Sequence, residues 1–509
     1  MNIVYHQHGN FVFLKEGLAQ LGHNIFPISF REGESFDEQV YAVCKDVDIV
    51  FFEMYGPFKL PADMEKSQIC RVAYCIDGPM YEFFLIHTMK LFDYVFVDQR
   101  STVDILLKYG IKSSWLPLCV PNDNFRSSTP KKYDITFVGH ISSDRTKRKN
   151  LLDLVKNNFS LNYVFGVDLH TMLDIFAESK IVLNENHFNG INLRLFQALA
   201  SGSLLLTEKD SDGLEALFED GKHLITYTSD TIISKIKEYL NSDQREKIAY
   251  NGYIECKNKH SSLARAKECL NIIANKNQRN LPRDEDELLL AQASAIYIRT
   301  IRFGGTYKWS MDLVKRGIGC NGKHIGQLYT LLGMMSYTIG QTEQAEHYFY
   351  KGFSNGDKIT ALAQLILMYV HNKNFERAKK LLYMLIDLFN GKCDYIIKFI
   401  KDEIKGFSRE SQLFFSLARI LFESGNIYFV GFNSALGIDR YLPITAVEVA
   451  YMAWKIEYNP TILDFIIHCY KIKQIDTEAT LLLKIAKDKN VITKRQERLY
   501  TNLLHKAYS

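Results

Sequence analysis

Residues 181–202 read IVLNENHFNGINLRLFQALASG, and they indicate the fold class. An apolar run ends at Leu183, a polar loop follows, and an amphipathic segment continues to Gly202. This pattern predicts a buried strand, a loop and a helix, the repeating unit of a parallel α/β sheet. The first backbone N–H groups of such a helix favour an anion, most naturally a phosphate. Arg194 adds a permanently charged, forked donor in the first turn.

The same alternation of short apolar runs and amphipathic segments extends along the chain on both sides of this stretch. It begins at residues 2–5 and continues to residues 113–116, and after a proline-containing interruption it restarts at residues 133–138. Strands that alternate with helices form parallel, doubly wound sheets. We therefore predict two Rossmann-like lobes, an N-terminal lobe at residues 1–125 and a C-terminal lobe at residues 126–278.

Residues 285–509 have a different pattern, because the strand signal stops and helical periodicity takes over. Ala345 and Ala378 lie 33 positions apart in similar surroundings, a spacing close to the period of tetratricopeptide repeats. We predict an all-α, tetratricopeptide-like repeat domain here. An irregular helical bundle is the alternative that stays open.

The composition is that of a folded protein without a dominant electrostatic field. Hydrophobic residues make up 47% and aromatic residues 13% of the 509 residues, which allows sizeable cores. The formal charge of +4 gives no support to a nucleic-acid or anionic-membrane role. Neither a leader pattern nor an apolar run of about 18 residues is found, so we expect a cytoplasmic protein. The nine scattered cysteines indicate neither a disulfide framework nor a zinc site.

The stretch at 181–202 resembles the donor-binding segment of GT-B glycosyltransferases, in particular the CgeB-like spore-protein family of group 1 glycosyl transferases. The matching positions are Asn184, Gly190, Asn192, Arg194, Phe196, Ala200, Gly202, Leu217, Phe218, Gly221 and Tyr227. The segments YDITFVG at 133–139 and FDYVFVD at 92–98 also match, so the resemblance covers most of residues 48–240. It implies two lobes facing each other across a cleft and transfer of a sugar from a nucleotide-diphosphate donor.

The resemblance implies that the second lobe binds most of the donor. Arg145 and Lys149, in the basic segment 139–149, would stabilise the charge that develops on the leaving nucleoside diphosphate in the absence of a metal. The predicted donor-binding residues are Gly9, Gly139, His140, Arg145, Lys149, Asn184, Glu185, His187, Gly190, Asn192, Arg194 and Gln197.

These positions also have structural interpretations, which stay open at this point. Arg194 can form a structural salt bridge, Asn184 and Asn192 can cap or turn the backbone, and a basic segment can be a solvated helix face. The resemblance is also incomplete, because Asn189 and Gln197 stand where many retaining members carry two glutamates. Gln197 can still bond a ribose diol, but retention or inversion of the anomeric configuration is left undetermined.

The catalytic candidates lie in the first lobe. Asp77, in the Asp-Gly-Pro sequence that follows an apolar run, is the leading candidate for a general base acting on an acceptor hydroxyl. His8 is a second candidate, in the loop that follows the first predicted strand. The alternative for Asp77 is an ordinary turn. Because no Asp-x-Asp sequence stands at a plausible strand end, we predict no catalytic metal and no cofactor besides a UDP- or GDP-type co-substrate.

These observations favour a metal-independent glycosyltransferase whose helical region recruits the acceptor. A concave repeat surface suits protein segments, so we predict a protein or glycan acceptor, for example a bacterial surface or flagellar protein. The main alternative is a non-catalytic nucleotide- or carbohydrate-binding protein or scaffold on the same fold. An epimerase or a phosphorylase also stays open, because fold does not fix reaction.

Overall fold

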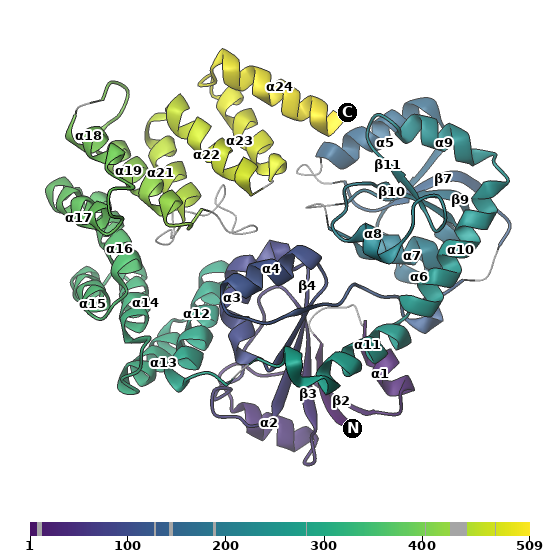
Figure 1. Ribbon diagram of the computed structural model, residues 1–509, viewed down its shortest axis with the longest axis horizontal. Helices are drawn as coiled ribbons and strands as arrows, with labels where there is room; N and C mark the ends of the chain where they lie inside the picture. The colour runs from purple at the N-terminus through teal and green to yellow at the C-terminus, as the bar shows by residue number, and fades with distance from the viewer. Residues whose placement is uncertain are drawn as a thin grey trace.

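The computed structural model contains two α/β lobes followed by an arm of α-helices (Figure 1). It describes residues 1–7, 13–126, 129–141, 146–186, 190–280, 282–402, 404–427, 445–473 and 475–508. The predicted fold class, two doubly wound lobes followed by an all-α region, is confirmed.

The first lobe is built on a parallel six-stranded sheet with the order β2-β1-β3-β4-β5-β6. Its strands are β1 (Asn2–Gln7), β2 (Asn24–Ile28), β3 (Ile49–Tyr55), β4 (Cys70–Ile76), β5 (Tyr94–Val97) and β6 (Ser114–Trp115). Its helices are α1 (Lys15–Gln20), α2 (Phe36–Val43), α3 (Glu82–Thr88) and α4 (Arg100–Lys108), with the short 3-10 helices η1 (Gly78–Tyr81), η2 (Met89–Leu91) and η3 (Asn122–Asn124). The inner strands β1, β3, β4 and β5 are almost wholly buried, as expected of a parallel sheet covered on both faces. The edge strands β2 and β6 are partly exposed.

The second lobe has a parallel five-stranded sheet with the order β11-β10-β9-β7-β8. Its strands are β7 (Tyr133–Val138), β8 (Leu161–Val164), β9 (Ser179–Leu183), β10 (Leu204–Glu208) and β11 (Ile225–Tyr227). Its helices are α5 (Thr146–Asn158), α6 (Leu169–Ala177), α7 (Leu193–Ala200), α8 (Leu214–Leu217), α9 (Ile232–Leu240) and α10 (Gln244–Lys259). The order of the strands reverses between β7 and β9, and ligands of open α/β sheets bind at the carboxyl ends of strands at such a point.

Helix α11 (Ser262–Ala274) returns from the second lobe to the first. It packs against α1 so closely that a Cβ on Gly17 would lie 2.2 Å from the Ser262 carbonyl oxygen. Ala266 and Cys269 of α11 are buried in the same core as Leu18. The predicted boundaries assign this helix to the second lobe, and its apolar face lies in a core that contains residues of both lobes.

The arm begins on the first lobe and curves round toward the second (Figure 1). Leu289 and Leu328 of the arm are buried in one core with Phe83 of α3. At the far end, α24 packs against α5, and Lys473 lies 3.7 Å from the carboxylate of Glu82. The helices are α12 (Glu285–Phe303), α13 (Lys308–Gly319), α14 (Ile325–Thr338), α15 (Thr342–Ser354), α16 (Lys358–His371), α17 (Phe375–Asp387), α18 (Tyr395–Lys401), α19 (Arg409–Glu423), α21 (Ala446–Glu457), α22 (Pro460–Ile472), α23 (Asp476–Asp488) and α24 (Lys494–Tyr508), with η4 (Lys276–Gln278) before them.

Consecutive helices of the arm pack in pairs, and α14 with α15 is the closest example. A Cβ on Gly333 would lie 2.6 Å from the Phe349 ring, so the small residue lets the ring approach the helix. Assignment of the arm to the tetratricopeptide class stays a prediction.

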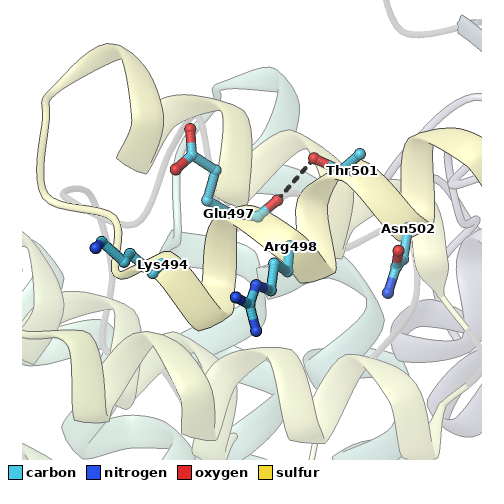
Figure 2. A pocket seen from close by; sticks show the side chains of 5 residues that line it. All are labelled: Lys494, Glu497, Arg498, Thr501 and Asn502. Carbon is cyan, nitrogen blue, oxygen red and sulfur yellow. Dashed lines mark hydrogen bonds between the residues drawn. The ribbon is translucent and has the colours of Figure 1, made fainter.

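Helix α24 carries a polar hollow of about 380 Å³, lined by Lys494, Glu497, Arg498, Thr501 and Asn502 (Figure 2). Within the described residues, no helix combines the length and apolar character that a membrane span requires.

Candidate functional site

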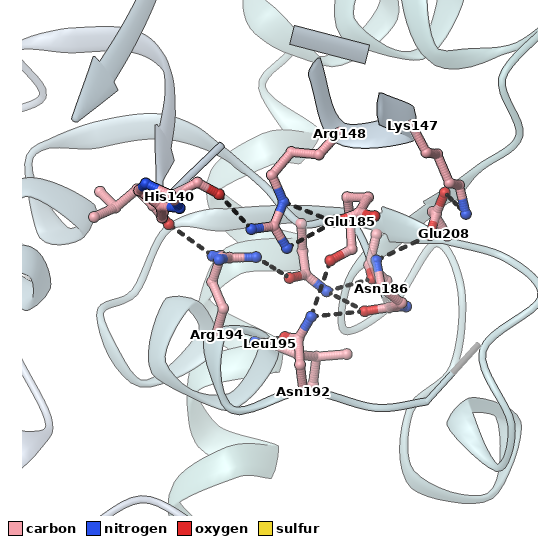
Figure 3. A network of polar contacts seen from close by, with 12 residues as sticks. His140, Lys147, Arg148, Glu185, Asn186, Asn192, Arg194, Leu195 and Glu208 are labelled. Carbon is pink, nitrogen blue, oxygen red and sulfur yellow. Dashed lines mark hydrogen bonds and ion pairs between the residues drawn. The ribbon is translucent and has the colours of Figure 1, made fainter. Parts of the chain in front are cut away.

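The polar loop after β9 is folded back onto the start of α7 by Asn192. The Asn192 side-chain oxygen accepts a hydrogen bond from the Leu195 N–H at 3.2 Å and so caps the helix. Its amide nitrogen donates to the Glu185 carbonyl and to the Asn186 side-chain oxygen, both at 3.0 Å (Figure 3). The capping role considered from the sequence is therefore the one that the structure places at Asn192.

Asn184 is fully buried beneath this loop. Its amide nitrogen donates to Asn186 Oδ1 at 2.7 Å and to Thr207 Oγ1 at 3.0 Å, and its backbone carbonyl accepts from the Tyr227 hydroxyl at 2.7 Å. Its Oδ1 accepts from Arg194 at 3.2 Å. The side chain is thus fully engaged within the protein, where it shapes the loop.

Arg194 lies at the carboxyl ends of β7 and β9. Its Nε donates to the Val138 carbonyl at 2.8 Å, and its guanidinium lies 4.6 Å from the centre of the Phe137 ring. A Cβ on Gly139 would be 2.5 Å from Arg194 Nη2, so only glycine leaves room for this position of the guanidinium. Arg194 and Gly139, both predicted donor-binding residues, are thereby brought together at the point where the strand order reverses.

A buried ion pair, which the sequence reasoning missed, lies beside Arg194. Arg148 Nε and Nη2 donate to Glu185 Oε2 at 2.9 and 2.8 Å, and the two side chains are only 8% and 3% exposed (Figure 3). Arg148 Nη1 also donates to the His140 carbonyl at 2.8 Å. Lys149, predicted at this place, is exposed on α5. Both residues belong to one basic segment, and only the orientation of the helix on the sheet distinguishes them.

A second cation–carboxylate pair forms the rim of the same edge. Lys147 lies 2.7 Å from Glu208, and the other carboxylate oxygen of Glu208 accepts from the Asn186 N–H at 2.9 Å (Figure 3). Burial raises the pKa of Glu208, and Lys147 opposes that rise. The carboxyl edge of the second sheet therefore holds two ion pairs, Lys147 with Glu208 and Arg148 with Glu185, beside the guanidinium of Arg194.

The remaining predicted donor residues are placed as follows. Gln197 is buried on α7, 7% exposed, and the His140 ring packs edge-on against Phe165 at 6.2 Å. Gly190 contacts Gln99 of the first lobe, since a Cβ there would lie 2.5 Å from Gln99 Oε1. The predicted residues outside the described part of the chain are His8, Gly9, Arg145 and His187, and Asn189 lies outside it too.

Asp77 lies in a tight turn between β4 and η1. Its backbone is left-handed, with φ 56° and ψ 40°, and its N–H donates to Asp98 Oδ2 at 3.0 Å. Gly78 N–H donates to Asp98 Oδ1 at 3.4 Å. The structure therefore contains the turn considered as the alternative for Asp77, and a second carboxylate supports it.

Asp98 was not singled out from the sequence as a site residue. It is 2% exposed, directly after β5, and burial together with the nearby charge of Asp77 raises its pKa to about 7. The feature of the sequence that could have identified Asp98 is an acidic residue at the end of a buried strand, within the segment 92–98 that matches the family. Two carboxylates thus meet at this edge of the first sheet.

Another buried carboxylate, Glu53 of β3, lies behind the first strand. It accepts hydrogen bonds from the Tyr5 hydroxyl and, at 2.9 Å, from the Phe13 N–H, and burial raises its pKa to about 7. A cavity of about 270 Å³ adjoins Tyr5, lined further by Gln7, Lys15, Pro27, Ile28 and Ser29. Within the described residues, no three His, Cys, Asp or Glu side chains gather into a candidate metal site.

Residues 131–271 match the family model described as Glycosyl transferase-like. No curated protein matches the chain. Among solved structures, Anabaena Alr3699/HepE in complex with UDP-glucose has a TM-score of 0.42 at 9% identity, covering 54% of this chain and 100% of that chain. An alpha-glucosyltransferase in complex with UDP and a 13-mer DNA containing a central A:G mismatch has a TM-score of 0.40 at 12% identity, with coverage of 54% and 100%.

Proposed function

We propose that this chain is a glycosyltransferase, which moves a sugar from a nucleotide-diphosphate donor on the second lobe to an acceptor over the first. One observation carries the proposal. The glycosyl transferase-like match at 131–271 contains the helix start that Asn192 caps and from which Arg194 reaches Val138 at the switch point of the sheet.

The donor diphosphate is proposed to lie at the N-terminal end of α7. A helix N-terminus favours negative charge, and Arg194 holds a permanent positive charge beside it. Stabilisation of the leaving nucleoside diphosphate by Arg, Lys and the helix dipole requires no metal. We propose a UDP- or GDP-type donor without a further cofactor.

Asp77 is the proposed general base toward the acceptor hydroxyl, since it is half-buried at the carboxyl edge of the first sheet. The arm is proposed to recruit the acceptor, a protein or glycan such as a bacterial surface or flagellar protein. This extension rests on the curvature of the arm, which begins on the first lobe and reaches α5 of the second.

A non-catalytic nucleotide- or carbohydrate-binding protein is the second candidate function. It is favoured by the internal hydrogen bonds of Asn184 and by the Arg148–Glu185 pair, which occupy polar groups of the donor segment within the protein.

The test is the melting temperature of the protein with UDP-, GDP-, dTDP-, CMP- and ADP-sugars, followed by release of free nucleotide. A ligand at a hundredfold excess over its dissociation constant adds about 2.7 kcal/mol to the stability. We expect one nucleotide family to raise the melting temperature and to be hydrolysed slowly without acceptor. A rise without hydrolysis favours the non-catalytic alternative, and the absence of any rise contradicts donor binding.

A further inference from the structure

We infer that Asp98 and Gln99, here called the interlobe bridge, couple the turn that carries Asp77 to the start of the donor helix α7. The inference rests on the proposed function and deepens it, because it names positioning residues for the reaction. These residues lie on the first lobe, between the end of β5 and the beginning of α4. The side chain of Gln99 contacts the second lobe directly.

Gln99 makes the contact between the lobes. Its Nε2 donates to the Ile191 carbonyl at 2.9 Å, and its Oε1 accepts from the Ile191 N–H at 3.0 Å. Gln99 is 6% exposed, so both hydrogen bonds are shielded from water. A carboxamide can donate and accept at once, which neither a carboxylate nor an apolar side chain can do. Gly190 lies against the same amide, where a Cβ would be 2.5 Å from Oε1.

Asp98 connects Gln99 to the turn. Its carboxylate accepts from the Asp77 N–H, from the Gly78 N–H and from Gln99 Nε2, the last at 2.9 Å. A left-handed aspartate is sparsely populated and persists where neighbours hold it. The Asp98 carboxylate therefore holds the backbone of the candidate base and orients the amide that bonds Ile191.

A continuous series of hydrogen bonds thus runs from Asp77 to Ile191, one residue before the Asn192 cap of α7. Trp115 lies alongside it, since its indole N–H donates to the Asp98 carbonyl at 3.0 Å and its ring would be 2.8 Å from a Cβ on Gly213 of the second lobe. A shift of the lobes that accompanies donor binding must move or break these hydrogen bonds. The position of the candidate base Asp77 is therefore coupled to the position of the donor helix.

Other contacts between the lobes in this region differ from the bridge in exposure. Arg100 pairs with Glu215 at 2.8 Å, but the side chains are 51% and 72% exposed. Exposed pairs contribute little, whereas a buried donor or acceptor left without a partner is costly. Arg100→Ala is therefore the matched control, because it breaks an exposed contact between the lobes and leaves the hydrogen bonds of Gln99 in place. The Arg100 guanidinium also lies 6.0 Å from the centre of the Trp115 ring, so the Trp115 signal of this variant is compared with its own signal without ligand.

The experiment measures release of free nucleotide from the nucleotide-sugar that raises the melting temperature. It compares KM and kcat for the wild type, Gln99→Leu, Gln99→Glu and Arg100→Ala. We expect Gln99→Leu to lower kcat/KM roughly ten- to hundredfold, the effect of stranding buried backbone groups of Ile191, and Arg100→Ala to change it less than about twofold. Gln99→Glu is a pH-dependent rescue, because a protonated carboxyl can both donate and accept. Its activity relative to wild type should rise as the pH falls. Equal kinetics for Gln99→Leu and Arg100→Ala would overturn the inference.

A spectroscopic readout separates coupling from simple loss of stability. The chain has three tryptophans, so labelled indole N–H signals can be assigned by Trp115→Phe. Titration with the nucleotide-sugar should shift the Trp115 signal in the wild type and in Arg100→Ala, and not in Gln99→Leu at a saturating concentration. A shift of equal size in Gln99→Leu would contradict the coupling.

Hydrogen exchange distinguishes failure of this inference from failure of the proposed function. Exchange in a peptide that contains Ile191, measured without ligand, should be faster in Gln99→Leu than in the wild type and unchanged in Arg100→Ala. If no nucleotide-sugar binds but exchange follows this order, the proposed function is wrong and the bridge is retained as a contact. If exchange is the same in all three proteins, the bridge itself is wrong.

Discussion

The carboxyl edges of the two sheets differ in how they treat buried carboxylates. In the second lobe, Glu185 and Glu208 each pair with a cation of α5. In the first lobe, Glu53 and Asp98 are buried with hydrogen bonds from hydroxyl, amide and backbone N–H groups, and no ion pair to either is seen within the described residues. Burial raises the pKa of Glu53 and of Asp98 to about 7, and it also raises the pKa of Glu208, where the charge of Lys147 opposes the rise. Two similar sheets thus place cation-paired carboxylates at one carboxyl edge and carboxylates with hydroxyl, amide and backbone donors at the other.

The largest effect is expected at the carboxyl edge of the second sheet, where the buried carboxylates pair with cations. Arg148→Met leaves the buried carboxylate of Glu185 without its cation, and we expect a loss of about 3–5 kcal/mol in the free energy of unfolding of the second lobe. Urea unfolding measures it, with the double variant Arg148→Met, Glu185→Leu as control. The double variant should recover most of the loss, and if it is as unstable as the single variant, the pairing is not the cause.

The next largest effect is expected at the first sheet, where the stability should depend on pH through the buried carboxyl of Glu53. The pKa of Glu53 is raised from 4.5 to about 7 in the folded state, so the folded protein holds a proton that the unfolded chain releases. The stability that this proton supplies is fully present below pH 4.5 and is lost as the pH rises through 7, of the order of 3 kcal/mol in all. Glu53→Gln keeps the shape without the titration. Its melting temperature relative to wild type should therefore increase from pH 5 to pH 8, and a constant difference would contradict the assignment.

A smaller effect is expected for Arg194→Lys. A lysine keeps the charge but lacks the fork that bonds the Val138 carbonyl and Asn184 at once. We expect the dissociation constant of the nucleotide-sugar to rise roughly tenfold, about 1.4 kcal/mol, as measured by calorimetric titration. Lys156→Ala, which removes an exposed cation further along α5, is the control and should bind as the wild type does.

The smallest effect is expected at the exposed pair between the lobes. Arg100→Ala removes its ion pair with Glu215, and we expect the free energy of unfolding to change by less than about 1 kcal/mol. Urea unfolding beside Arg148→Met gives the direct comparison of an exposed with a buried pair. A loss as large as that of Arg148→Met would mean that exposure does not decide the worth of these pairs.

The local structure could be predicted from the order of the residues. The strand, loop and helix read from 181–202 are β9, its loop and α7, and Asn192 is the cap. Such features are predictable because a strand, a cap and a helix stop each depend on residues within a few positions. The two lobes and the helical arm follow from the same local signals added along the chain.

The contacts between side chains could not be predicted in this way, because they depend on how the elements pack. Lys149 and Arg148 are neighbours in sequence, yet the orientation of α5 on the sheet buries Arg148 against Glu185 and leaves Lys149 in solvent. Gln99 and Ile191 are 92 residues apart, and nothing local to either predicts their contact. The physical reason is that a side chain's partners are set by the packing of whole elements against one another, which periodicity along the chain does not encode.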